Sequence, residues 1–234
     1  RDTGYINGQK CHCFKQAIID TVYSQSNIRE ILERENFSTF KYDYYSDSDI
    51  NPATGLSSLK TMKNAVCECH RFIDDFENKP KNLFLYGNTG VGKTFLSHCI
   101  AKELMDSAYS VIYFTAAGLF DILAENTFGK RQDKDSDVFE HIYDCDLLII
   151  DDLGTELPNS FTVSQLFICL NERILRQKST IISTNLALED IKSIYSERTF
   201  SRISSNYTIL RITGDDIRIQ KKLLNLGGTN DVTP

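Results

Sequence analysis

A glycine-rich segment between an apolar run and a helical pattern sets the strongest limit on how this chain can fold. Residues 82–86 are mostly apolar and predict a buried parallel strand, and the pattern from Phe95 to Met105 predicts a helix. Between them, the sequence satisfies the phosphate-loop spacing G-x-x-x-x-G-K-[ST], which predicts a site for a nucleoside triphosphate. The residues of this predicted loop are Gly87, Asn88, Thr89, Gly90, Val91, Gly92, Lys93 and Thr94.

The chemistry of these residue types supports the prediction. Glycines allow the backbone to curl so that successive N–H groups point at phosphate oxygens, and the positive end of the following helix adds to that field. Lys93 can then reach the β- and γ-phosphates, and the Thr94 hydroxyl can ligate Mg²⁺. The alternative is a chance match in a glycine-containing turn. The strand before the loop and the helix after it favour the phosphate site.

A second stretch supplies the acidic half of such a site. Residues 147–150 (Leu-Leu-Ile-Ile) predict a buried strand, which ends in Asp151 and Asp152 as a Walker B arrangement. We expect Asp151 to hold Mg²⁺ and Asp152 to orient and deprotonate the attacking water. The alternative is that two aspartates merely solubilise a strand end. Asn185 ends the next strand, where it can reach the γ-phosphate or the water.

The order of the predicted elements defines the fold class. Strands alternate with helices, which predicts an α/β fold with a parallel five-stranded sheet between helices and a minimal one-helix lid after the last strand. We expect the strand at Val111–Phe114 to lie between the phosphate-loop strand and the Walker B strand. That spacing is typical of the additional-strand class of P-loop NTPases. Residues 37–48, rich in Tyr, Phe and Asp, are expected to form a linker strand against the main domain.

Three regions are predicted along the chain. They are an N-terminal appendage and linker at 1–50, an ATPase domain at 51–226 and a flexible tail at 227–234. Because the first residue is Arg1 and not Met, we expect the chain to be a fragment. Cys11 and Cys13 are either half of a zinc site whose other ligands lie upstream, or two free thiols, since a structural zinc usually takes four ligands.

Composition excludes several classes of protein. The sequence contains no apolar run near the roughly 18 residues that a membrane span needs. A net charge of −6 argues against a protein that coats nucleic acid indiscriminately. Seven scattered cysteines, an odd number, fit a reducing cytoplasm better than a disulfide framework. We therefore expect a cytoplasmic protein without a membrane segment.

Arginines near the C-terminal end are candidates for catalysis. Arg198 and Arg202 lie at i and i+4, on one face of a predicted helix. Such a pair suits an arginine finger offered to a neighbouring subunit, and the alternative is a solvated helix face. Arg218, at the start of the last predicted helix, can fold back on the nucleotide of its own subunit.

In order and spacing, these motifs resemble the AAA+ ATPases of the DnaC/DnaI/IstB type, which are bacterial replicative-helicase loaders and a transposition helper. The likeness covers about residues 80–222 and rests on Gly87–Thr94, Leu147–Glu156, Ser183–Asn185, Glu197–Arg202 and Asp216–Arg218. The resemblance implies ATP or ADP and Mg²⁺ as ligands at Lys93, Thr94 and Asp151. It also implies that Asn185 is sensor I, Arg202 a finger acting in trans and Arg218 sensor II.

The same resemblance implies partners. It implies a ring or spiral of identical subunits, a replicative helicase and contact with single-stranded DNA. Residues 4–45 are similar to the zinc-bearing lead-in of DnaI-like proteins, which implies Zn²⁺ in a full-length protein. Stacking and phosphate contacts to DNA are expected from four residues, for which an ordinary exposed loop is the alternative. They are Phe128, Lys130, Arg131 and Phe161.

The leading hypothesis is thus an ATP-dependent loader of a replicative helicase. Many AAA+ proteins have Glu where this chain has Asp152, and the shorter side chain predicts slow, partner-stimulated turnover. The lack of a guanine-reading N-K-x-D motif favours adenine. Three alternatives stay open: an IstB-like ATPase helper of a DNA transposase, a small-molecule kinase with a phosphate loop, and a nucleotide-gated binding module without useful hydrolysis.

Overall fold

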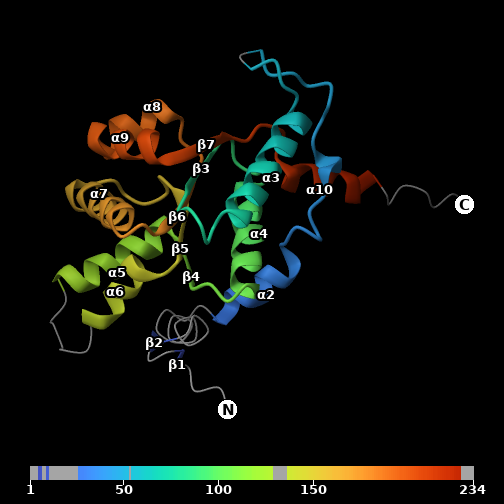
Figure 1. Cartoon of the computed structure of the whole chain (residues 1–234). Helices are drawn as coiled ribbons and strands as arrows, with labels where there is room; N and C mark the ends of the chain where they lie inside the picture. The colour runs from blue at the N-terminus through green and yellow to red at the C-terminus, as the bar shows by residue number, and fades with distance from the viewer. Residues whose placement is uncertain (1–4, 7–8, 11–25, 53, 129–135, 228–234) are drawn as a thin grey trace, which may run out of the picture.

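The centre of the molecule is a parallel sheet of five strands in the order β4-β5-β6-β3-β7 (Figure 1). The computed structural model describes residues 5–6, 9–10, 26–52, 54–128 and 136–227. The strands are β3 (Asn82–Tyr86), β4 (Val111–Thr115), β5 (Leu147–Leu153), β6 (Ser179–Thr184) and β7 (Tyr207–Arg211). Two short strands before them, β1 (Tyr5–Ile6) and β2 (Gln9–Lys10), pair antiparallel.

Helices cover both faces of this sheet (Figure 1). On one side lie α2 (Ser26–Arg34), α3 (Ser58–Asp74), α4 (Lys93–Asp106) and α10 (Ile217–Gly227). On the other lie α5 (Ala116–Phe128), α6 (Ser136–Asp144), α7 (Ser160–Leu175), α8 (Leu188–Tyr195) and α9 (Glu197–Asn206). The predicted α/β fold, with a five-stranded parallel sheet and one helix after the last strand, is confirmed.

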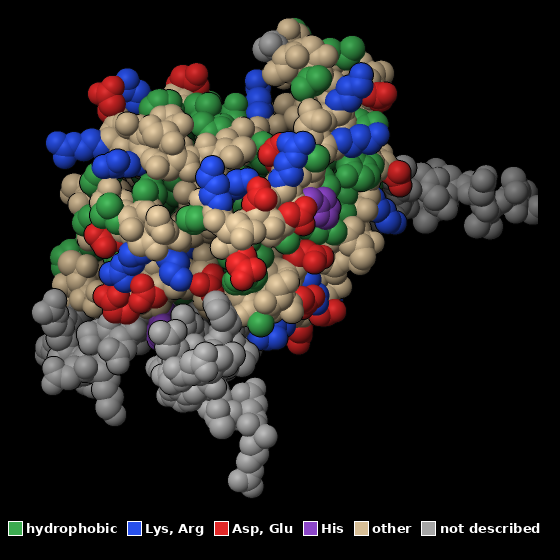
Figure 2. Space-filling model, viewed as in Figure 1, with side chains coloured by type: hydrophobic (Ala, Val, Ile, Leu, Met, Phe, Trp, Pro, Cys, Tyr) green, Lys and Arg blue, Asp and Glu red, His purple; other side chains and the backbone are tan. Residues whose placement is uncertain are grey.

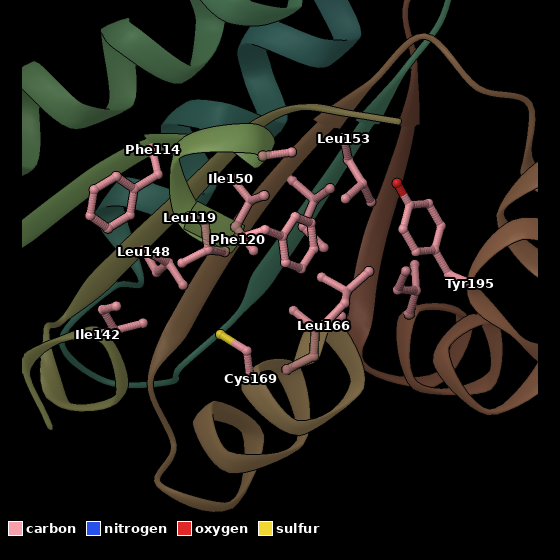
Figure 3. Packing of buried hydrophobic residues seen from close by; sticks show 14 of the residues in the cluster. Phe114, Leu119, Phe120, Ile142, Leu148, Ile150, Leu153, Leu166, Cys169 and Tyr195 are labelled. Atoms are coloured by element: carbon pink, nitrogen blue, oxygen red, sulfur yellow. The ribbon is translucent and has the colours of Figure 1, made fainter. Parts of the chain in front are cut away.

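The core forms two layers because neighbouring strand residues point to opposite faces of the sheet. Leu83 and Leu85 pack with α3 and α4, whereas Phe84 between them packs with the helices of the other side. Figure 3 shows this second layer, in which side chains of β4 and β5 meet those of the helices α5–α8. Burial on both faces of the sheet explains why β3, β4 and β5 carry continuous apolar runs.

The predicted place of the 111–114 strand is wrong. This strand, β4, forms the edge of the sheet beside β5, and the strand between β3 and β5 is β6. Connections between parallel strands are right-handed, so a chain that reverses direction along the sheet must change faces. After β3, the chain crosses to the far edge with α4 on one face, and it returns through β5 and β6 with helices on the other face. One strand still separates β3 from β5.

The segment before α3 also differs from expectation. Residues 37–48 form no strand; a short 3₁₀ helix, η1, spans Tyr42–Tyr44. The segment nevertheless lies against the main domain, because buried Tyr45 joins the same core layer as α3 and α4. Ile28 and Leu32 of α2 join that layer too. The domain limits at 50 and 226 stay a prediction.

Several expectations fall on parts of the chain that are not described. Cys11, Cys13 and residues 228–234 lie outside the described residues. Within the described ranges, no helix has the length and apolarity required to cross a membrane. Five cysteines in those ranges are free thiols, namely Cys67, Cys69, Cys99, Cys145 and Cys169.

Candidate nucleotide site

The phosphate loop joins the end of β3 to the start of α4, in the strand–loop–helix arrangement that the motif requires. Its backbone depends on glycine at position 92, where φ is +100°, and α4 starts directly afterwards. Within the described residues, no hydrogen bond involves the backbone N–H groups of residues 88–92. A curled run of unbonded N–H groups at a helix N-terminus is suited to bind phosphate oxygens.

Gly87 lies where the loop leaves β3 and meets the segment after β7. Its φ is +149°, and a Cβ atom there would lie 2.0 Å from the carbonyl oxygen of Ile212. We expect Gly87→Ala to lower the free energy of unfolding by about 3 kcal/mol, because backbone must move. Gly55→Ala is the matched control, since Gly55 has φ +66° but open space around its Cβ position, and about 1 kcal/mol is expected there. Chemical denaturation of both variants measures the difference, and equal losses would contradict the steric explanation.

Lys93 lies inside the curl of the loop. Its side chain is 4% exposed, and its Nζ donates hydrogen bonds to the carbonyl oxygens of Gly87 (2.9 Å) and Asn88 (2.7 Å). A third bond, of 2.7 Å, reaches Oδ1 of Asn185 at the end of β6. Burial lowers the pKa of Lys93, and the carboxylates of Asp152 and Asp151 act in the opposite direction. The predicted phosphate lysine and the predicted sensor asparagine therefore meet.

Asp151 is the most buried acid of the site, with 3% of its side chain exposed. The Thr94 hydroxyl donates to its two carboxylate oxygens at 3.1 and 3.0 Å. Ser183 of β6 donates to Oδ1, and the Tyr113 hydroxyl of β4 donates to Oδ2 at 2.6 Å. A buried carboxylate beside a threonine oxygen is a suitable oxygen set for Mg²⁺, with hydroxyl donors that orient the carboxylate.

Asp152 follows at a bulge of β5. Its backbone is left-handed, with φ +54°, and its N–H donates to Ser183 Oγ at 3.0 Å. The chain turns at this position, and both consecutive aspartates interact electrostatically with Lys93. Burial, and then the charge of Asp151, raises the pKa of the Asp152 carboxyl group. A raised pKa strengthens a carboxylate as a proton acceptor.

Arg218 lies near the loop but is held by a neighbour. Its Nε and Nη2 donate to Asp216 at 3.2 and 3.0 Å, and the Ile217 N–H donates to the carbonyl oxygen of Gly90 at 3.0 Å. Lys93 and Asp152 both interact electrostatically with Arg218. The start of α10 is thus attached to the phosphate loop, with the predicted sensor II arginine at the same place.

Arg202 is not brought to this site. It lies exposed on α9, as does Arg198, and within the described residues its side chain has no hydrogen-bond or ion-pair partner. Its separation from the loop of its own subunit is compatible with the expected role in trans. That role stays a prediction.

The predicted DNA contacts are described in part. Phe128, 74% exposed, lies at the end of α5, and its ring centroid is 5.1 Å from that of Phe161 at the start of α7. Lys130 and Arg131 lie outside the described residues. On the face shown in Figure 2, acidic and basic side chains are interspersed. No group of side chains suited to hold a metal by itself occurs among the described residues, so zinc has no support there.

Three residues that contact the site are not identified as site residues by the sequence analysis. Ser183 and Tyr113 both hold Asp151, and the Tyr45 hydroxyl donates to the carbonyl oxygen of Val91 in the loop at 2.9 Å. A residue with a hydroxyl group near the carboxyl end of a buried strand is the signal that could have identified Ser183 and Tyr113. Glu156, which follows β5, accepts hydrogen bonds from the Tyr195 hydroxyl and from the Gly154 N–H.

The site lies at the carboxyl ends of β3, β5 and β6, where ligands of parallel sheets bind. Beside the loop is a pocket of about 410 Å³, lined by Gly87, Asn88, Asn185 and residues 49–52 and 211–215, among others. The unbonded loop amides, the lysine and the hydroxyl–carboxylate cluster match the phosphates of a nucleotide and one divalent cation. These residues therefore fit the ligands that the sequence predicts.

Comparisons with known proteins agree with this geometry. Residues 22–225 match the family described as IstB-like ATP binding protein. The chain is 22% identical over 179 residues to the replicative helicase loader DnaC of Escherichia coli (strain K12), covering 74% of this chain and 73% of DnaC. The crystal structure of the DnaC helicase loader aligns with a TM-score of 0.62 at 22% identity, over 79% of this chain and 99% of that one. The crystal structure of DnaI aligns with a TM-score of 0.61 at 25% identity, over 79% and 94%.

Proposed function

Because the chain belongs to the family of IstB-like ATP-binding proteins, with the AAA+ fold of the helicase loaders, we propose that it is an ATPase that loads a replicative helicase onto single-stranded DNA. The observation that carries the proposal is the meeting of Lys93, Asn185, Thr94 and Asp151 at one edge of the sheet. Similarity to the loader DnaC over most of both chains supports the replication role.

In the proposed mechanism, Lys93 and the loop N–H groups bind the β- and γ-phosphates, and Thr94 and Asp151 hold Mg²⁺. Mg²⁺, when bound, supplies charge neutralisation on those phosphate oxygens. Asp152 orients and deprotonates the attacking water, and Asn185 contacts the γ-phosphate or that water. Arg202 completes the site of a neighbouring subunit in a ring or spiral, and Arg218 leaves Asp216 to contact the nucleotide of its own subunit. Turnover is slow until a partner assembles the site.

The proposal includes DNA contact and location. The exposed Phe128 ring beside Phe161 offers a stacking surface for single-stranded DNA, with Lys130 and Arg131 as phosphate contacts. Free thiols at all five described cysteines support a reducing, cytoplasmic location. Zinc at Cys11 and Cys13 remains an expectation for a longer protein.

A second candidate is an ATPase helper of a DNA transposase, which is favoured by the description of the matching family. The two candidates differ in the DNA that they engage. A helper that forms filaments on duplex DNA, and shows no stimulation by single-stranded DNA or a helicase, would replace the loader in this proposal.

The test is nucleotide binding and single-turnover hydrolysis, with and without single-stranded DNA and the replicative helicase of the same cell. We expect tight Mg²⁺-dependent ATP binding and slow hydrolysis that DNA or helicase accelerates. Asp152→Asn should lower hydrolysis about 100-fold with ATP affinity unchanged, because it removes the proton acceptor only. Asp121→Asn, an exposed aspartate on α5, is the control. Lack of ATP and ADP binding by the wild-type protein would overturn the proposal.

A further inference from the structure

The hydroxyl of Tyr113 is an unassigned part of the site. Tyr113 is half-buried in the edge strand β4. Thr115, two residues further along the same strand, pairs in register with Asp151 of β5. Because residues two apart share a face of the sheet, Tyr113 points to the same side as Asp151. Its phenol reaches along the sheet to Asp151 Oδ2 at 2.6 Å. Tyr113 is thus one of three hydroxyl donors, from three elements, that fix this carboxylate.

The ring of Tyr113 has a support of its own. His98 of α4, 5% exposed, lies with its ring centroid 5.1 Å from that of Tyr113. On its other side, His98 Nδ1 donates to Glu35 Oε2 at 2.6 Å. Glu35 directly follows α2, whose last turn it joins through a bond to the Ile31 carbonyl oxygen. A continuous line of contacts therefore runs from the end of α2 to the Walker B aspartate.

We propose that Tyr113 is a positioning residue for Asp151, and that Glu35 and His98 hold the Tyr113 ring so that the seating of α2 sets the affinity of the site for Mg²⁺. The inference rests on the proposed function, since it assigns a cation to Asp151. Donors behind a metal-binding carboxylate fix its orientation, and their loss typically costs 10- to 100-fold in metal affinity or activity.

The first test is Tyr113→Phe, which removes one oxygen and keeps the ring. The Mg²⁺ concentration for half-maximal ATP binding and hydrolysis should rise about 10-fold. ATP affinity measured in EDTA should not change, because Lys93 and the loop bind phosphates without the cation. Tyr143→Phe, which removes a hydroxyl from a half-buried tyrosine of α6, should leave both quantities at the wild-type value.

The second test separates the contact line from the general docking of α2. Glu33 and Glu35 both tie this helix region to α4, Glu33 through Lys102 at 3.2 Å and Glu35 through His98. Glu35→Ala should raise the Mg²⁺ requirement about 3-fold, and Glu33→Ala should not. In the double variant with Tyr113→Phe, Glu35→Ala should add nothing, because both changes act through the same hydroxyl.

The outcomes distinguish this inference from the function on which it rests. If the wild-type protein binds no ATP or ADP, the proposed function fails first. If it binds, and Tyr113→Phe shows the wild-type Mg²⁺ requirement, the role of Tyr113 is overturned while the function stands. Equal effects of Glu33→Ala and Glu35→Ala, or additive effects of Glu35→Ala and Tyr113→Phe, would overturn the link to α2.

Discussion

Lys93→Ala is expected to reduce ATP affinity about 1000-fold and to bring hydrolysis down to background. The Nζ group is buried inside the loop, where it donates to the carbonyl oxygens of Gly87 and Asn88. Two charge-assisted hydrogen bonds to phosphates contribute roughly 2 kcal/mol each, and about 4 kcal/mol corresponds to a factor near 1000 in affinity. Calorimetric titration with ATP and Mg²⁺ measures the binding, and single-turnover assays measure the chemistry.

The control for Lys93→Ala lies on the same helix. Lys102 of α4 pairs with Asp106 and Glu33 at the surface, so Lys102→Ala removes a lysine but no phosphate contact. Thermal unfolding of both variants checks that the loop variant is folded, because Lys93→Ala leaves three acceptors without their donor. ATP affinity within threefold of wild type in a folded Lys93→Ala protein would refute the assignment of the phosphate loop.

Arg202→Ala is expected to lower hydrolysis by the assembled protein about 1000-fold while ATP binding by each subunit stays normal. An arginine that reaches the γ-phosphate of a neighbour stabilises charge in the transition state, and such fingers contribute factors of 10³ to 10⁵. Arg202 is exposed and lies away from the loop of its own subunit, so its loss should not affect nucleotide binding. Arg198→Ala, one turn earlier on α9, should cost far less.

Whether Arg202 acts in trans can be tested by mixing two inactive variants. An Arg202→Ala subunit has an intact phosphate loop, and a Lys93→Ala subunit has an intact finger. Mixed assemblies should therefore regain part of the hydrolysis that neither protein shows alone. Full activity of Arg202→Ala by itself, or no recovery in mixtures that co-assemble, would rule out the finger role.

The local chemistry of the site could be predicted from the sequence, but the arrangement of the strands could not. The spacing of Gly87, Lys93 and Thr94 is a property of one short segment, and so is the Asp151-Asp152 pair. Strand order is instead decided by how crossovers pack on the two faces of the whole sheet. The residues of β4 (VIYFT) and β6 (STIIST) are both typical of a buried strand, and nothing within either strand indicates which one lies beside β3.

Contacts between side chains that are far apart in the sequence could not be predicted either. Ser183 reaches Asp151 because β6 lies between β5 and β3, in the place predicted for β4. Tyr113 reaches it across the β4–β5 pair, a contact that no short motif indicates. The strand predicted at residues 37–48 is wrong for a different reason. Aromatic residues are common in strands, which is why a strand is predicted there. Instead, Tyr45 contacts the phosphate loop and Phe40 packs on Phe95 of α4, and a short 3₁₀ helix between them allows both contacts.

Two segments hydrogen-bond to the phosphate loop, one that precedes it in the sequence and one that follows it. Tyr45 holds the Val91 carbonyl from the N-terminal side, and the Ile217 amide holds the Gly90 carbonyl from the C-terminal side. An expressed fragment that lacks Tyr45 or Ile217 would leave one loop carbonyl oxygen without the hydrogen bond that it accepts in the intact chain. Fragment boundaries chosen from the phosphate-loop and Walker B motifs alone would therefore yield a domain that retains its sheet but alters its own ligand affinity.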